Sequence, residues 1–177
     1  MQRARKAQVL VLLAPGFEEY DVAMVARTLR RAGLPVVLVG LTGGPLRGCY
    51  GVSLAPDKTL SEVEPEDAVA VVLPGGTQGA RQLNSDPRVH TLLRRVMDQG
   101  GYLLALDTGY TVLHTAGTLN RSERPLVIGG VASWQGDALA SRRVVVEGQV
   151  IFGRDLGAAQ ESALTLAALL ESGPWPG

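Results

Sequence analysis

The chain alternates between short runs of apolar residues and longer segments in which apolar residues recur every three or four positions. Short runs that are apolar throughout are typical of strands buried on both faces, and the longer spacing is typical of amphipathic helices. The runs predict strands at residues 9–14, 34–41, 69–73, 102–106, 126–131, 142–146 and 150–152. The spacing predicts helices at residues 19–31, 86–99, 108–116 and 157–171, with shorter helical pieces at 59–63 and 81–83.

Strands that alternate with helices predict an α/β fold, with a doubly wound parallel sheet sandwiched by helices. The 177 residues suit a single domain, 1–177, with ends at about 1–7 and 172–177 that we expect to be flexible. Closely spaced glycines in residues 42–54 predict a small hairpin at the margin of the sheet. In such folds the ligand site lies outside the carboxyl ends of the strands.

An acidic residue, Asp107, stands where the strand at 102–106 passes directly into the helix at 108–116. Because no turn residues separate the two, its side chain is expected at the carboxyl edge of the sheet, beside free helix N–H groups. Asp107 then either does chemistry or caps the helix, since Asp is among the best N-cap residues. The sequence Asp-Thr-Gly-Tyr-Thr also resembles motifs of sugar kinases and haloacid-type phosphatases. Those motifs lie near the start of their domains, and the phosphatase motif needs a second Asp where Gly109 stands.

Two other strand ends carry residues suited to a site. Glu18, Glu19 and Asp21 follow the first predicted strand, and Gly75-Gly76 follow the third. The carboxyl ends of parallel strands meet at one edge of a sheet, so these residues should converge with Asp107.

Charge and cysteine content narrow the function classes. The 17 basic and 17 acidic residues balance, so no net charge draws the chain to nucleic acid or to an anionic membrane. No apolar run approaches the roughly 20 residues of a membrane span, and the run after the basic start is too short for a secretory signal. The single Cys49 cannot form an internal disulfide, which fits a cytoplasmic protein.

Five segments together carry a family resemblance. They are residues 13–21 (Leu-Ala-Pro-Gly-Phe-Glu-Glu-Tyr-Asp), 71–76 (Val-Val-Leu-Pro-Gly-Gly), 104–109 (Leu-Ala-Leu-Asp-Thr-Gly), 56–57 (Pro-Asp) and 157–163 (Gly-Ala-Ala-Gln-Glu-Ser-Ala). This set resembles the DJ-1/PfpI (ThiJ) superfamily, which includes peptidase-like, chaperone, glyoxalase and deglycase branches. The resemblance covers nearly the whole chain and implies a flavodoxin-like fold and a homodimer.

The resemblance also assigns a site, with one departure. The family has a reactive Cys at the elbow, where this chain has Asp107, so thiolate chemistry is impossible at that position. Asp21 stands where the family has a Glu that contacts the elbow, and Gly75 and Gly76 match its backbone oxyanion donors, to which we add Thr108. Glu18 and Arg154 are assigned to the pocket rim.

No histidine stands ready to serve this site. Many relatives bring a His to the site from the region that matches residues 127–130, which contains none here. His114 lies seven residues beyond Asp107, a rise of about 10.5 Å along a helix, and His90 begins the preceding helix. Both are interpreted as packing or surface residues, and Arg154-Asp155 is either a rim segment or a surface ion pair.

Two functional hypotheses follow. In the first, the chain has lost Cys-dependent catalysis and works as a binding, stress-response or regulatory dimer, with Asp107 and Asp21 as a carboxylate pair in a retained pocket. In the second, it is a hydrolase or lyase, glyoxalase- or deglycase-like, with Asp107 as nucleophile or as general acid/base with Asp21. Neither requires a cofactor or a metal, and a small-molecule ligand is the expected partner besides a second copy.

Two expectations about geometry can be tested directly. Compared with the family pattern, Asp107 is longer than the elbow Cys, and Asp21 is shorter than the Glu that contacts it. The two differences in length compensate, so the carboxyls of Asp107 and Asp21 should meet at hydrogen-bonding distance and share one proton. Cys49, in the marginal hairpin, should lie apart from the pocket.

Overall fold

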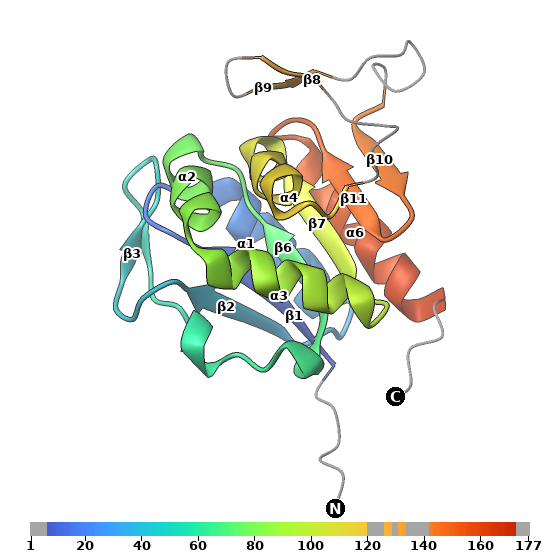
Figure 1. Cartoon of the computed structure of the whole chain (residues 1–177), viewed down its shortest axis with the longest axis horizontal. Helices are drawn as coiled ribbons and strands as arrows, with labels where there is room; N and C mark the ends of the chain where they lie inside the picture. Colours follow the sequence, from blue (N-terminus) through green and yellow to red (C-terminus); the bar gives the residue numbers. More distant parts are fainter. Residues whose placement is uncertain (1–6, 120–125, 129–130, 134–141, 173–177) are drawn as a thin grey trace, which may run out of the picture.

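The computed structural model describes residues 7–119, 126–128, 131–133 and 142–172. Most of both ends that we expected to be flexible therefore lies outside the described residues. A seven-stranded sheet with the order β10-β11-β7-β6-β1-β2-β5 forms the centre (Figure 1). Its strands are β1 (Gln8–Leu13), β2 (Val36–Gly40), β5 (Lys58–Thr59), β6 (Ala68–Leu73), β7 (Tyr102–Leu106), β10 (Val144–Glu147) and β11 (Val150–Gly153).

All neighbouring strands pair in parallel except β10, which runs antiparallel to β11. The antiparallel pair arises because only Gly148 and Gln149 separate the two strands, and so short a link cannot hold a parallel crossover. The carboxyl ends of β1, β6, β7 and β11 consequently lie along one edge.

Helices cover both faces of the sheet (Figure 1). On one face, α1 (Glu19–Arg31) and α6 (Ala158–Ser172) pack against each other and share a buried cluster with the strands. On the other, α2 (Thr77–Ser85), α3 (Pro87–Asp98) and α4 (Tyr110–Ala116) share a second cluster. The predicted flavodoxin-like α/β sandwich is confirmed, because two separate apolar layers require helices on both sides.

The smaller elements match the predictions unevenly. The marginal hairpin is confirmed as a separate two-stranded sheet of β3 (Leu46–Arg47) and β4 (Ser53–Leu54). The helical turn at 59–63 is the 3₁₀ helix η1 (Leu60–Glu62), and a second one, η2 (Pro65–Asp67), follows it. The strand predicted at 126–131 is wrong, since β8 (Leu126–Ile128) and β9 (Val131–Ser133) form a separate hairpin.

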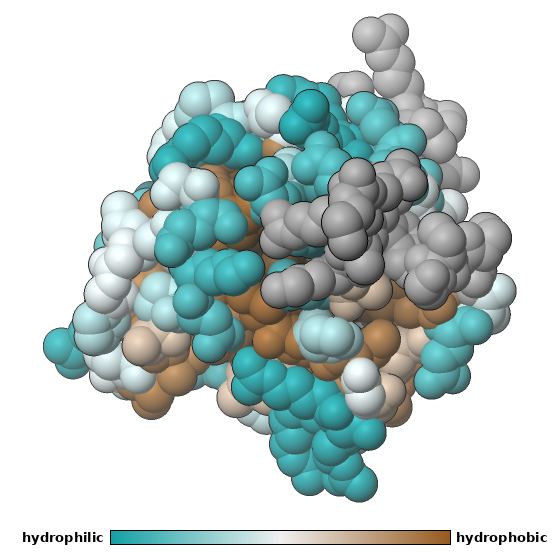
Figure 2. All heavy atoms as spheres, turned by 90° about the horizontal axis from the view of Figure 1, so that it is seen from below, coloured by the Kyte–Doolittle hydropathy of each residue, from teal (hydrophilic) through white to brown (hydrophobic). Residues whose placement is uncertain are grey.

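One face of the molecule presents both polar and apolar side chains. Figure 2 shows a face on which hydrophilic side chains occupy much of the periphery and apolar side chains appear between them across the middle. Among the described residues, no helix combines the length and the apolar character needed to cross a membrane.

Candidate functional site

The junction between β7 and α4 is a sharp elbow built on Asp107. A single turn of 3₁₀ helix, η3 (Asp107–Gly109), joins the two elements. Asp107 has φ 43°, and it is the one non-glycine residue with a positive φ in the described part of the chain. Asp tolerates this left-handed region better than most residues, but such a conformation still costs on the order of 1–3 kcal/mol. The predicted strand-to-helix corner is therefore present, and it is strained.

Two glycines allow the neighbouring loops to close on this elbow. A Cβ on Gly109 would lie 2.5 Å from the carbonyl oxygen of Leu73, and one on Gly76 would clash with the carbonyl oxygen of Gly16. Gly76 also has φ 99°, which L side chains rarely adopt. The ends of β1, β6 and β7 thus approach one another so closely that only glycine fits, and the predicted convergence of these strand ends is confirmed.

Asp21 lies at the centre of this convergence. It belongs to the first turn of α1, is 1% exposed, and accepts a hydrogen bond through Oδ2 from the N–H of Gly75 at 2.8 Å. The N–H of Glu18 donates to the carbonyl oxygen of Gly75 at 2.9 Å. The start of α1 therefore holds both polar groups of the Gly75 backbone. An oxyanion role for Gly75 would require Asp21 to release its N–H.

The protonation of Asp21 is unusual. Its Oδ1 is buried and has no hydrogen-bond partner. Burial raises the pKa of Asp21 from 3.8 to about 7, the bond from Gly75 opposes this, and the charges of Glu18 and Asp107 raise the pKa further. The single hydrogen bond from Gly75 is outweighed by burial and by the charges of two nearby acids, so the carboxyl of Asp21 is half-protonated near neutral pH.

The elbow acid and the buried acid flank Gly75 without touching each other. A Cβ on Gly75 would lie 2.9 Å from Oδ2 of Asp21 and 3.5 Å from Oδ2 of Asp107. The expected direct hydrogen bond between the carboxyls is wrong, because Oδ1 of Asp21 has no partner and Oδ2 is bonded to Gly75. The physical reason is that α1 directs Oδ2 of Asp21 to the N–H of Gly75. The two acids remain coupled through their charges.

Asp107 is not a helix cap either. The N-cap positions of η3 and α4 are Leu106 and Gly109, and no hydrogen bond joins the Asp107 carboxylate to a helix N–H group among the described residues, so the expected contact is absent. Asp107 is exposed, and it is the first residue of η3, one position after the N-cap Leu106. The carboxylate is therefore open to a ligand at the surface of the elbow.

The single cysteine lies closer to this site than predicted. The N–H of Cys49 donates to the carbonyl oxygen of Phe17 at 2.9 Å, and its thiol donates to Oε2 of Glu18 at 3.3 Å and to Oε2 of Glu19 at 3.4 Å. The expectation that Cys49 lies apart from the pocket is wrong, because the marginal hairpin folds over the first turn of α1. Cys49 thereby contacts Glu18, the residue assigned to the rim.

These contacts keep the thiol protonated. The pKa of Cys49 is raised to about 12 by desolvation, by the hydrogen bonds from the thiol to Glu18 and Glu19, and by the negative charges of these two acids. Although Cys49 is exposed as a residue, its thiol faces these two carboxylates, which oppose the loss of its proton. Glu18, Glu19 and Cys49 also place three potential metal-ligating atoms within 4.8 Å of one another. A Cys that binds a metal must lose its proton, whereas this thiol keeps its proton and shares it with two carboxylates. The three residues therefore form a hydrogen-bonded cluster rather than a metal site.

The remaining assigned residues lie around the elbow. Oγ1 of Thr108 is buried without a hydrogen-bond partner. Arg154 directly follows β11, whose last residue Gly153 is in register with Leu106, so Arg154 lies at the same edge as Asp107. The neighbouring Asp155 forms an exposed ion pair with Arg143 at 3.6 Å.

The histidines lie as expected, away from the acids. The ring centroid of His114 is 6.4 Å from that of Tyr110, and Nε2 of His90 is 3.2 Å from Oδ1 of Asn84. The site as described therefore offers an exposed carboxylate, a buried acid that titrates near neutral pH and an unpaired hydroxyl. Such a set can exchange a proton or bind a polar ligand, whereas it has no thiolate.

A doubly wound sheet with a strained strand-to-helix elbow at its carboxyl edge defines a class of α/β proteins whose elbow residue faces a ligand pocket. The model of the DJ-1/PfpI family matches residues 7–169, and the chain belongs to this family. It is 36% identical over 166 residues to Protein dj-1beta of Drosophila melanogaster, which covers 89% of this chain and 86% of that protein.

Two further similarities agree. Glutathione-independent glyoxalase DJR-1.2 of Caenorhabditis elegans is 28% identical over 169 residues, 95% of this chain and 90% of that protein. The crystal structure of Drosophila melanogaster DJ-1beta superposes with a TM-score of 0.81 at 32% identity, over 95% of this chain and 92% of that chain. The family and the fold are therefore shared over most of the chain.

Proposed function

We propose that this chain is a DJ-1/PfpI-family protein that has lost Cys-dependent catalysis and works as a binding, stress-response or regulatory dimer. The observation that carries the proposal is the elbow itself, where Asp107 stands in the strained position. The one cysteine supports it, because its thiol is held protonated between Glu18 and Glu19. Asp107 and Asp21 are the residues through which the pocket would recognise a ligand.

The direct test is an assay with methylglyoxal, the small dicarbonyl substrate expected of a glyoxalase branch. The wild-type protein is expected to show absent or very weak turnover, and Cys49→Ser is expected to leave any residual rate unchanged. The double substitution Asp107→Cys with Asp21→Glu rebuilds the elbow that the family resemblance implies, and it should gain a thiol that reacts with iodoacetamide and peroxide. Robust wild-type turnover that disappears in Cys49→Ser would contradict the proposal.

One observation favours a second candidate, a Cys-independent hydrolase or lyase. Asp21 has a raised pKa of about 7 and a buried, unpaired Oδ1, which suits a general acid/base near neutral pH. In this candidate Asp107 acts as the second carboxyl, and the relative with the glyoxalase name supports a carbonyl substrate. Turnover that survives Cys49→Ser and is lost in both Asp21→Asn and Asp107→Asn would support it over the binding role.

The dimer belongs to the same proposal. Tyr20, Tyr50 and Val52 have large apolar side chains that are 47%, 78% and 54% exposed. They lie on adjoining segments, because the carboxylate of Glu19 accepts hydrogen bonds from the N–H groups of Tyr50 and Val52 at 2.8 and 3.1 Å. Covering this surface with a second copy would remove it from water. Sedimentation should give a dimer in the wild type and a monomer in Tyr50→Glu, and a wild-type monomer would contradict this part.

A cytoplasmic location and a small-molecule ligand complete the proposal. The balanced charge of the chain gives no reason to expect nucleic acid or a membrane surface as a partner. A thermal-shift screen with small aldehydes, acids and phosphorylated metabolites tests the ligand, because a molecule that binds the folded state raises the melting temperature. A hit that is lost in Asp107→Asn would place the ligand at the elbow.

A further inference from the structure

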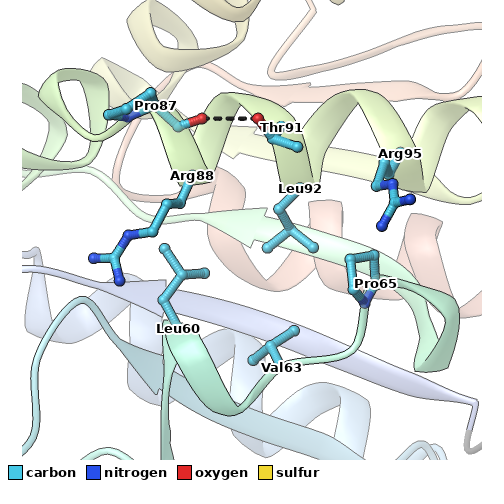
Figure 3. A pocket seen from close by; sticks show the side chains of 8 residues that line it. All are labelled: Leu60, Val63, Pro65, Pro87, Arg88, Thr91, Leu92 and Arg95. Atoms are coloured by element: carbon cyan, nitrogen blue, oxygen red, sulfur yellow. Dashed lines mark hydrogen bonds between the residues drawn. The ribbon is translucent and has the colours of Figure 1, made fainter.

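A groove lies on the face of the molecule opposite to α1, between α3 and the segment that carries η1 and η2. It has a volume of about 310 Å³, and none of its lining residues belongs to the elbow site. One wall consists of Leu60, Val63 and Pro65, and α3 supplies the other wall with Pro87 and Leu92 (Figure 3). Leu60 and Leu92 are almost fully buried, so the floor of this groove is continuous with the apolar core.

Charged groups lie at the two ends of the groove. Arg88 and Arg95 stand seven residues apart on α3, about 10.5 Å along the helix, and Leu92 lies between them. In Figure 3 the side chain of Arg88 lies beyond Leu60, and that of Arg95 lies beside Pro65. The groove therefore combines an apolar centre with a cation at either end.

The two arginines differ in their availability. The guanidinium of Arg88 makes three hydrogen bonds to Asp86, the shortest at 2.6 Å from Nη2 to Oδ2. Arg95 has a single ion pair, from Nη1 to Oε1 of Glu66 at 3.5 Å, and both side chains are at least half exposed. Exposed pairs of this length contribute little, so an incoming anion can displace Glu66 at small cost. Arg95 is the end at which a ligand's charge can be bound.

We propose that this groove binds a free amphiphilic carboxylate of medium chain length. Its carboxylate pairs with Arg95, which can present two parallel N–H groups, and its alkyl chain covers Leu60, Val63 and Leu92. The volume is at the lower limit of small-ligand sites, which suits a chain of roughly eight carbons better than a large ring system. The site is independent of the elbow, so it stands whether or not the proposed function holds.

Octanoate is the probe, with binding measured by calorimetry and located by NMR chemical-shift changes. Wild-type protein should bind octanoate more tightly than butanoate, because the four added methylenes are removed from water in the groove. The expected gain is only about tenfold, because the groove is open and removes them from water only in part. Octan-1-ol, which lacks the charge, should bind about tenfold more weakly than octanoate. The shifted resonances should belong to η1, η2 and α3.

Two substitutions at the groove should act in opposite directions. Arg95→Gln should weaken octanoate binding about tenfold. Glu66→Gln removes the competing carboxylate and should strengthen binding about two- to fivefold. Arg81→Gln on α2, an exposed arginine outside the groove, is the matched control for net charge and should leave the affinity unchanged.

The proposal is overturned if octanoate shows no saturable binding at millimolar concentration, or if Arg95→Gln binds as tightly as the wild type. Equal affinity for butanoate and octanoate would also overturn it, since the apolar groove would then take no part. Co-sedimentation with anionic phospholipid vesicles tests whether the groove binds a free carboxylate or a membrane surface. The protein should stay in the supernatant, and co-sedimentation that Arg95→Gln abolishes would replace the free carboxylate with a lipid surface.

Discussion

Glu19 and Asp21 lie two residues apart in the first turn of α1, and the structure treats them in opposite ways. Glu19 accepts hydrogen bonds from two backbone N–H groups of the hairpin and from the thiol of Cys49. Although desolvation acts against it, these bonds lower the pKa of Glu19. Asp21 has one donor and deep burial, and its pKa is raised to about 7.

The comparison teaches that the number of donors, weighed against burial, decides what an acid can do. An acid with several donors is a fixed anion that holds a loop in place, whereas a buried acid with a single donor can exchange its proton near neutral pH. The turn that begins α1 therefore separates a structural acid from a candidate functional one. The predictions below test this separation, starting with the largest expected effect.

Asp21→Asn should stabilise the protein at pH 8. The folded-state pKa of Asp21 is raised from 3.8 to about 7, so between these values the folded state binds more protons than the unfolded state, and stability falls as the pH rises. At about 1.4 kcal/mol per pKa unit, the substitution should recover about 2–4 kcal/mol of unfolding free energy at pH 8 and little below pH 4. Chemical denaturation at pH 4 and pH 8 measures this.

Asp98→Asn, at an exposed acid near the end of α3, is the control and should change the unfolding free energy by less than about 0.5 kcal/mol at both pH values. If Asp21→Asn destabilises the protein equally at pH 4 and pH 8, Asp21 is a fixed anion like Glu19, and the contrast between the two acids fails.

The elbow should respond to backbone preference rather than to charge. Asp107 has φ 43°, a conformation that a β-branched residue adopts only with strain and that glycine adopts freely. We expect Asp107→Val to be less stable than Asp107→Gly by about 1–2 kcal/mol, measured by thermal or denaturant unfolding at one pH. Equal stability of the two variants would show that the elbow relaxes and stores no strain.

Glu19→Gln should loosen the hairpin without altering the titration of Asp21. The substitution weakens the bonds to the N–H groups of Tyr50 and Val52, and since Glu19 is partly exposed the loss should be about 1 kcal/mol. The pKa of Glu19 is lowered, so its stabilisation is present above its unfolded pKa and is lost as the pH falls through its folded pKa. Hydrogen exchange at residues 49–52 is the measurement, and unchanged protection would contradict the anchoring role.

The smallest expected effect on stability is that of Cys49→Ser, and the informative property of Cys49 is the reactivity of its thiol. Desolvation together with Glu18 and Glu19 raises the pKa of the thiol to about 12, so the native protein should react with iodoacetamide at pH 8 much more slowly than the unfolded chain. Mass spectrometry gives both rates, and Cys49→Ser should be nearly neutral in stability. A native rate equal to the unfolded rate would show that the two carboxylates do not hold the thiol.

Much of the fold could be predicted from the sequence because buried parallel strands are short apolar runs. The strand at Tyr102–Leu106 and the helix at Glu19–Arg31 were predicted with their observed bounds. Helix α2 was predicted too short, since most of Thr77–Ser85 is polar and few of its positions are buried. The separation of β8 and β9 was missed because the predicted strand was carried through Gly129-Gly130, although a Gly-Gly dipeptide between apolar residues favours a hairpin.

The sequence predicted which candidate site residues lie near one another, but it did not predict the hydrogen bonds that they form. Parallel strand ends meet at one edge, which placed Asp21, Gly75 and Asp107 together from topology and family resemblance. The hydrogen bond from Gly75 that occupies Asp21 depends on where the first turn of α1 points, and the contact of Cys49 with Glu18 depends on how a glycine-rich hairpin folds back. Neither has a local signature, because both join residues more than 30 positions apart in the chain.

The measurement that tests the central claim most directly is the titration of the Asp21 side-chain carboxyl by carbon-detected NMR. The raised pKa predicts a midpoint near 7 in the wild type, and a lower midpoint in Asp107→Asn because one of the charges that raise it is removed. A wild-type midpoint close to the ordinary 3.8, unchanged in Asp107→Asn, would contradict the claim that Asp21, buried beside the elbow, is an acid poised to exchange a proton.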